Sequence, residues 1–250
     1  MIICGNCVDV MATLNDKSID LTVTSPPYDN LRKYNGFTFD HEAIAQQLYR
    51  VTKPGGVVVW VVGDATIKGS ETGTSFKQAL YFMGLGFNLH DTMIWEKTNA
   101  LPLTHNRYEP VFEYMFVFSK DKPKTWNPIL IPCKLAGKSK NHGRYNATSI
   151  LTENGACRCR DEISIYKEFK QKGNVWQIAV AHNTKHPAIF PAQLAHDHII
   201  SWSNPGDAVL DPMCGSGTTL VEAAKLGRDY IGIDCSEEYC ELSRERLNDL

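Results

Sequence analysis

Two consecutive prolines placed directly after a short apolar run constrain the fold of this 250-residue chain more than any other feature. The run, residues 19–23, is apolar and partly β-branched, which favours a buried strand. Pro26 and Pro27 then fix φ and remove two backbone donors, so the strand ends in a loop whose carbonyls are available. Ser25 and Tyr28 add a hydroxyl and an aromatic ring. This set suits a planar ring with an exocyclic amino group, because oxygens accept its N–H bonds and Tyr28 stacks on its face.

A second strand followed by a reactive loop is expected late in the chain, where the apolar residues 208–211 precede a glycine-rich segment, 212–219. A P-loop would need lysine at position 218, where threonine stands. A dinucleotide fingerprint would need a third glycine where Leu220 stands. Both alternatives fail, and a tight turn at a helix start remains. Its backbone N–H groups suit a carboxylate ligand.

Asp234 ends the next apolar run, residues 230–234, and lies twenty-three positions after Asp211. An acid at this place can accept hydrogen bonds from both hydroxyls of a ribose, as in dinucleotide-binding folds. The alternative is that Asp234 caps the helix that begins after Ser236, although Ser236 could itself supply that cap.

Together these segments resemble the amino-group DNA methyltransferases, which use S-adenosylmethionine. Their catalytic motif, Asp/Asn/Ser-Pro-Pro-Tyr, corresponds to residues 25–28, and their cofactor motif corresponds to residues 211–219. The order, with the catalytic motif first, resembles the β class. The resemblance implies an α/β, Rossmann-like fold that is circularly permuted and carries an inserted target-recognition lobe.

The serine version of the motif is usually associated with N4 of cytosine, so the resemblance favours that base. Adenine N6 is the alternative. An RNA or protein amide methyltransferase and a catalytically inactive DNA-binding protein on the same fold are further alternatives. The catalytic residues implied are Ser25, Pro26, Pro27 and Tyr28. The residues implied to bind the cofactor are Asn6, Phe190, Asp211, Pro212, Cys214, Gly215, Ser216, Gly217, Thr218, Thr219, Asp234 and Cys235. Asn6 has the alternative role of a turn residue, and Phe190 that of a core aromatic.

Charge is distributed unevenly along the chain, although the net charge is only −2. Residues 120–172 contain twelve Lys and Arg against five Asp and Glu, and the remainder has fourteen against twenty-three. A basic lobe on an acidic body suits DNA binding, whereas the alternative is a solvated insertion. We therefore divide the chain into a catalytic half (1–119), a target-recognition insertion (120–185) and a cofactor half (186–250). The basic residues expected to contact DNA are Arg32, Lys33, Lys134, Lys138, Lys140, Arg144, Arg158 and Arg160.

Periodic patterns predict several further elements. Residues 41–51 have helical spacing, residues 57–62 read as a strand buried on both faces, and residues 76–85 read as another helix. Strands are expected at 91–95 and 111–118. Between 120 and 185 no clear run is expected beyond 161–170.

The remaining features limit the compartment and the partners. Apolar runs are too short for a membrane span and no export signal is evident, so we expect a cytoplasmic protein of a bacterium, archaeon or phage with reduced thiols. Cys4 and Cys7 have zinc-ligand spacing, but a second such pair is missing, and no metal is expected. Double-stranded DNA is the expected partner. A cognate restriction endonuclease and a second copy of the chain are the protein partners to consider.

Overall fold

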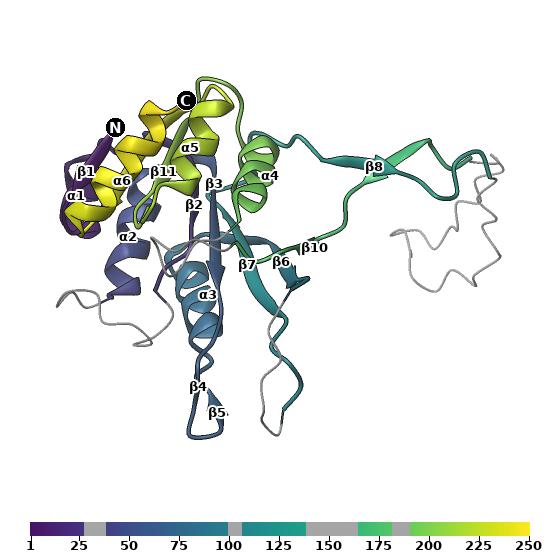
Figure 1. Ribbon diagram of the computed structural model, residues 1–250, viewed down its shortest axis with the longest axis horizontal. Helices are drawn as coiled ribbons and strands as arrows, with labels where there is room; N and C mark the ends of the chain where they lie inside the picture. The colour runs from purple at the N-terminus through teal and green to yellow at the C-terminus, as the bar shows by residue number, and fades with distance from the viewer. Residues whose placement is uncertain (28–38, 100–106, 139–164, 182–190) are drawn as a thin grey trace, which may run out of the picture. The chain divides into compact units, whose positions relative to one another are not determined.

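The computed structural model describes residues 1–27, 39–99, 107–138, 165–181 and 191–250. These form two compact units, one of residues 1–127 with 173–250 and one of residues 128–172. The larger unit is built on one eight-stranded sheet (Figure 1). Its strands are β1 (Ile2–Cys4), β2 (Ile19–Thr24), β3 (Thr52–Val62), β6 (Asn88–Lys97), β7 (Phe112–Ser119), β10 (Val175–Ile178), β11 (Ala208–Asp211) and β12 (Asp229–Asp234).

The strands lie in the order β1-β12-β11-β2-β3-β7-β6-β10. β7 is antiparallel to both of its neighbours, and the other adjacent pairs are parallel. The fold is therefore the mixed α/β class predicted from the sequence. A small hairpin of β4 (Thr66–Ile67) and β5 (Ser70–Glu71) follows β3.

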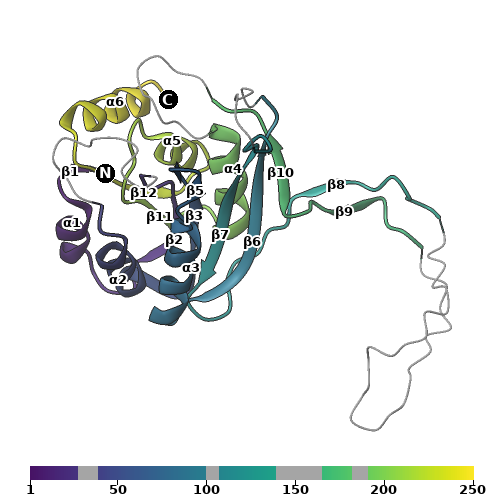
Figure 2. The same ribbon diagram turned by 90° about the horizontal axis from the view of Figure 1, so that it is seen from below.

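Helices cover both faces of the sheet. They are α1 (Cys7–Thr13), α2 (His41–Val51), α3 (Thr74–Leu85), α4 (Ala192–Trp202), α5 (Thr218–Lys225) and α6 (Glu237–Asn248). α1, α2 and α3 form one layer, and α4, α5 and α6 form the other (Figure 2). Burial on both faces explains why all of residues 57–62 are buried: Val58, Trp60 and Val62 join the core under α1 to α3, and the alternate valines point to the other face.

Two of the differences from the expectation concern α3 and β10. α3 forms over residues 74–85, but three of the apolar residues that mark it, Phe76, Leu80 and Met83, are exposed, and Ala79 and Phe82 make its buried face. β10 was not expected at all. It is a four-residue strand that pairs with β6 and buries Trp176. Its apolar alternation is short and lies in a stretch rich in lysine, asparagine and glycine, so it gave no clear strand signal. The β10 region therefore belongs to the larger unit, and the second unit, 128–172, is narrower than the predicted insertion, 120–185.

The second unit contains an antiparallel pair, β8 (Leu130–Pro132) with β9 (Phe169–Gln171). Backbone hydrogen bonds continue this ladder, from Cys133 N to Glu168 O (2.8 Å) and from Gly137 N to Tyr166 O (3.1 Å). Among the described helices, none has the length and apolar character that crossing a bilayer requires.

Candidate functional site

The two segments singled out in the sequence follow neighbouring strands. β2 and β11 are parallel and adjacent, with Leu21 opposite Val209 and Thr22 opposite Leu210. Parallel neighbours end at the same edge of a sheet, so the Ser25-Pro26-Pro27 segment and the glycine-rich loop, defined here as residues 212–219, both begin at one edge. The structure thus brings the two segments together. Ser25 and Pro27 are half-buried and Pro26 is buried.

Asp211 connects these two segments. Its Oδ1 accepts a hydrogen bond from Thr24 Oγ1 (2.8 Å), the last residue of β2, and another from Met213 N (3.1 Å). The Thr219 hydroxyl, which lies on α5, donates to Val23 O (3.2 Å) and is also within hydrogen-bonding reach of the Asp211 carboxylate. Asp211 is only 1% exposed, and burial raises the pKa of its carboxyl to about 6 although these donors pull it down. The carboxylate predicted to bind cofactor is therefore engaged inside the protein.

The glycine-rich loop is held from two sides. On one side, Cys214 N donates to Ile233 O (2.8 Å) and Gly215 N donates to Asp234 Oδ2 (2.9 Å), both at the end of β12. On the other side, Ser243 Oγ of α6 donates to Gly215 O (2.8 Å). Gly217 has a φ of +77°, and a Cβ there would lie 2.7 Å from Ser243 Oγ, so the position requires glycine. α5 begins at the next residue, and the N–H groups of its first turn have no acceptor inside the helix.

Asp234 holds the start of α6 as well as the glycine-rich loop. Its Oδ1 accepts from Ser236 N (2.9 Å) while its Oδ2 accepts from Gly215 N. Ser236 is the N-cap residue of α6 but its side chain makes no capping hydrogen bond, and the Asp234 carboxylate receives only the backbone amide of that residue. Each carboxylate oxygen has a second lone-pair direction, and Asp234 is only partly buried. The residue can therefore fix the loop and accept hydrogen bonds from a bound diol.

Asn6 lies beside the end of β12 because β1 and β12 pair in parallel, with Cys4 opposite Asp234 and Gly5 N donating to Asp234 O (2.9 Å). Asn6 Oδ1 accepts from Val8 N (2.8 Å) and caps α1, so the turn role is present in the structure. Cys235 is next to Asp234, and burial raises the pKa of its thiol. Burial likewise raises the pKa of the Cys214 thiol inside the loop. Both cysteines are protonated at neutral pH and are not nucleophiles.

Several predicted site residues fall outside the described residues. These are Tyr28, Arg32, Lys33, Lys140, Arg144, Arg158, Arg160 and Phe190. Lys134 and Lys138 are described and exposed in the unit 128–172. Among the described residues, no group of three or more His, Cys, Asp and Glu is arranged to hold a metal ion.

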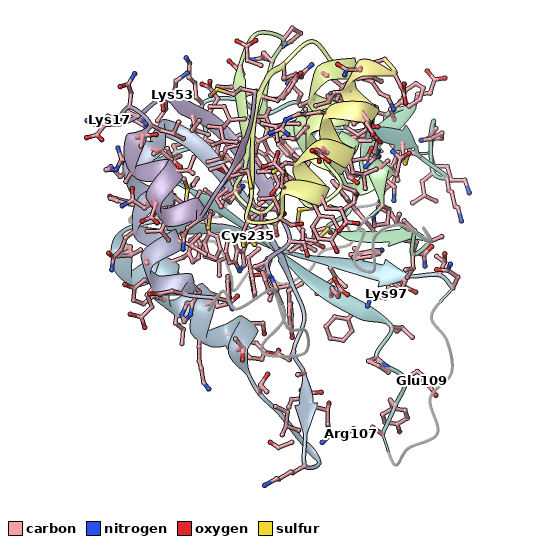
Figure 3. The ribbon with its side chains drawn as sticks, turned by 60° about the vertical axis from the view of Figure 1, so that its left-hand side comes forward. Lys17, Lys53, Lys97, Arg107, Glu109 and Cys235 are labelled. Atoms are coloured by element: carbon pink, nitrogen blue, oxygen red, sulfur yellow. The ribbon has the colours of Figure 1, made fainter. Side chains whose placement is uncertain are left out.

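Sequence reasoning missed the residues that support the site. Thr24 and Ser243 belong to no recognisable motif. A threonine at a strand end and a serine in a helix are too common to indicate a role. A long-range contact away from these residues was also missed: the Arg107 guanidinium donates to Gly69 O and lies 3.7 Å from Glu71 Oε1, which joins the segment before β7 to the β4–β5 hairpin (Figure 3). A glutamate and an arginine thirty-six positions apart give no local signal for that contact.

The acceptors and donors of the site fit a ligand that carries a ribose, a carboxylate and a planar base. Asp234 offers acceptors for a diol, the first turn of α5 offers N–H groups for a carboxylate, and the Asn6 segment lies beside Asp234. These features correspond to the chemical groups of S-adenosylmethionine.

Comparison with known proteins agrees with this geometry. The DNA methylase family N6_N4_Mtase matches residues 19–245. The orphan methyltransferase M.BamHII of Bacillus amyloliquefaciens is 54% identical over 245 residues, which cover 94% of this chain and 90% of that protein. The type II methyltransferase M.HpaI of Haemophilus parainfluenzae is 30% identical over 265 residues, covering 99% and 74%.

Solved structures share the fold. The cytosine-N4-specific PvuII DNA methyltransferase superposes with a TM-score of 0.71 at 21% identity, covering 98% of this chain and 85% of that one. The complex of M1.HpyAVI with S-adenosylmethionine superposes with a TM-score of 0.63 at 22% identity, covering 99% of both chains.

Proposed function

This chain belongs to the N6/N4 family of DNA methylases, and on that premise we propose that it methylates the exocyclic amino group of a DNA base, with cytosine N4 as the target. One observation carries the proposal. The parallel register of β2 and β11 starts the Ser-Pro-Pro segment and the glycine-rich loop at one edge of one sheet, so a base and a methyl donor can be bound side by side.

The methyl donor is S-adenosylmethionine, which supplies an electrophilic methyl group when bound. In the proposed arrangement the N–H groups at the start of α5 hold its carboxylate, Asp234 holds its ribose hydroxyls and Asn6 lies near its adenine. The hydrogen bond from Gly215 N to Asp234 keeps the Asp234 carboxylate oriented, because the donor is a backbone group that cannot rotate away.

The chemical task of the Ser-Pro-Pro segment is to make the target nitrogen nucleophilic. The lone pair of an exocyclic amine is delocalised into the base, so the nitrogen is a poor nucleophile. Ser25 Oγ and Pro26 O accept the two amino hydrogens, which favours a pyramidal nitrogen with a localised lone pair. The bound donor would supply the methyl group to this nitrogen, and the Ser25 and Pro26 acceptors would pass the displaced amino proton on to solvent. No covalent enzyme intermediate is needed.

A base in duplex DNA has to leave the stack to reach this edge. We propose that the nucleotide flips out, that Tyr28 stacks on it, and that the unit 128–172 recognises the surrounding sequence. That unit contains nine Lys and Arg against four Asp and Glu, and its exposed Lys134 and Lys138 suit phosphate contacts. The other basic residues predicted to bind DNA belong to the same proposal.

Cytosine N4 is preferred over adenine N6 because of Ser25, a neutral residue at the first position of the catalytic motif. The cytosine-N4 specificity of the structurally similar PvuII enzyme agrees with this choice. Adenine N6 is the second candidate, since it presents the same amino group beside a ring nitrogen.

The test is incubation of the purified chain with isotope-labelled S-adenosylmethionine and duplex DNA, followed by digestion and nucleoside mass spectrometry. N4-methylcytosine is the expected product. N6-methyladenine would transfer the proposal to the second candidate. Label in RNA or protein only, or DNA binding without label, would overturn it. Size-exclusion chromatography with light scattering would establish whether two copies associate. A search of the genes beside this one would show whether a cognate endonuclease is encoded there.

A further inference from the structure

The link between β2 and the glycine-rich loop is made by one buried carboxylate. Asp211 receives the Thr24 hydroxyl from β2, the Met213 amide from its own loop, and lies within reach of the Thr219 hydroxyl from α5. Thr24 and Thr219 are fully buried and Asp211 nearly so. None of the three side chains is therefore exposed to a ligand, although all lie next to the residues assigned to chemistry.

The donors that surround Asp211 require an acceptor. The Thr24 hydroxyl and the Met213 amide both donate to Oδ1 of Asp211, and an ionised carboxylate oxygen can accept both hydrogen bonds. Hydrogen bonds to a charged group are roughly twice as strong as neutral ones. A buried carboxylate is costly, so its retention at this junction is not explained by stability alone.

The junction sets the position of Ser25. Thr24 immediately precedes Ser25. Pro26 and Pro27, which follow Ser25, have restricted φ. A fixed Thr24 side chain therefore transmits its position to the catalytic segment with little freedom. On the other side, Met213 N ties the same carboxylate to the start of the glycine-rich loop, and Thr219 Oγ1 at the end of that loop donates to Val23 O of β2.

We propose that Asp211 is a positioning residue of the methyl-transfer site, which acts through the Thr24 hydroxyl and the Met213 amide to fix Ser25 relative to the glycine-rich loop. This inference rests on the proposed function, because it concerns the distance between a bound base and a bound methyl donor. It replaces direct cofactor binding as the role of Asp211. Misplacement of reacting groups by about 1 Å is enough to slow a reaction by orders of magnitude.

The test uses three threonine variants in β2. Thr24→Val keeps the shape and removes the donor to Asp211, whereas Thr24→Ser restores the donor. Thr22→Val is the matched control, because Thr22 is buried two residues earlier on the same strand and its hydroxyl has no hydrogen-bond partner among the described residues.

Positioning predicts that Thr24→Val lowers kcat by about tenfold or more while KM for donor and DNA changes by less than about threefold. Thr24→Ser recovers most of the rate, and Thr22→Val keeps it. Amide hydrogen exchange, measured without donor or DNA, gives a second readout. In Thr24→Val, exchange is faster in peptides covering 19–27 and 212–219 and unchanged in a peptide covering α2.

Wild-type kcat in Thr24→Val, or exchange that is faster throughout the chain, would overturn the inference. If Thr24→Val does not fold, Asp211→Ala, which removes the acceptor of both the Thr24 hydroxyl and the Met213 amide, carries the same prediction, and a wild-type kcat in that variant would overturn it. The two proposals fail separately: a wild-type chain that transfers no methyl group refutes the proposed function, whereas an active wild type with a fully active Thr24→Val refutes only the positioning role.

Discussion

Replacing Asp211 with asparagine gives a measurable electrostatic signature of the buried carboxylate. In the folded chain burial raises the pKa of Asp211 from an ordinary 3.8 to about 6. The folded state therefore binds a proton more tightly than the unfolded state between these two values. The stabilisation from this protonation is fully present below pH 3.8 and is lost as the pH rises through about 6. Asparagine does not titrate, so Asp211→Asn lacks this dependence.

The magnitude follows from the shift. About two pKa units at 1.36 kcal/mol each give a total of roughly 3 kcal/mol. Between about pH 4.5 and pH 7.5, linkage assigns about 2 kcal/mol of that total. The free energy of unfolding of the wild type should thus fall by about this amount relative to Asp211→Asn over the same interval. Other carboxyl groups titrate in both proteins and cancel in the difference.

The assay is urea unfolding of both proteins at several pH values, with the two free energies subtracted at each pH. A linear extrapolation with equal m-values is required for the subtraction to hold. The difference is expected to shift in favour of the variant as the pH rises. A difference that is flat with pH, or that shifts the other way, would show that Asp211 is not the buried, hydrogen-bonded carboxylate described here.

Three further substitutions have separate expected outcomes. Asp234→Ala should weaken donor binding by about tenfold or more in calorimetry, because it removes the charged acceptors proposed for the ribose and leaves Gly215 N–H without its partner; an unchanged Kd would contradict the proposed ribose role. Gly217→Ala should lower the free energy of unfolding by about 1–3 kcal/mol, since its φ is +77° and its new Cβ meets Ser243; wild-type stability in chemical denaturation would rule out the strain. Thr22→Val should raise that free energy by about 1 kcal/mol, because it removes a buried hydroxyl with no partner among the described residues, and a clear loss of stability would show that the hydroxyl is bonded.

The parts of the fold that the sequence predicted are those set by local pattern. The strands over 19–24, 57–62 and 208–211 and the helix over 41–51 were found because a buried strand or an amphipathic helix has a distinctive period. The two motif segments meet at one edge because β2 and β11, the strands that they follow, are parallel neighbours.

The parts that the sequence did not predict depend on contacts between distant segments. β10 is a strand because its residues meet the edge of β6, not because of its own pattern. The sequence did not show which side of α3 faces the sheet, because the helix has apolar residues on two sides. In the structure Ala79 and Phe82 face the sheet, and Phe76, Leu80 and Met83 are exposed. Asp211 was assigned to cofactor binding from its motif. Only the structure shows that the Thr24 hydroxyl, 187 positions away, donates a hydrogen bond to the Asp211 carboxylate.

The most direct test of the account is single-turnover methyl transfer to duplex DNA by the wild type, Ser25→Ala and Asp234→Ala, with donor affinity measured for each. One variant changes the segment proposed to bind the base and the other changes the residue proposed to bind the donor, and both variants should lose methyl transfer. Donor affinity should fall only in Asp234→Ala. Full transfer by Ser25→Ala, or a loss of donor affinity in that variant alone, would contradict the claim that the two segments act on the same methyl group.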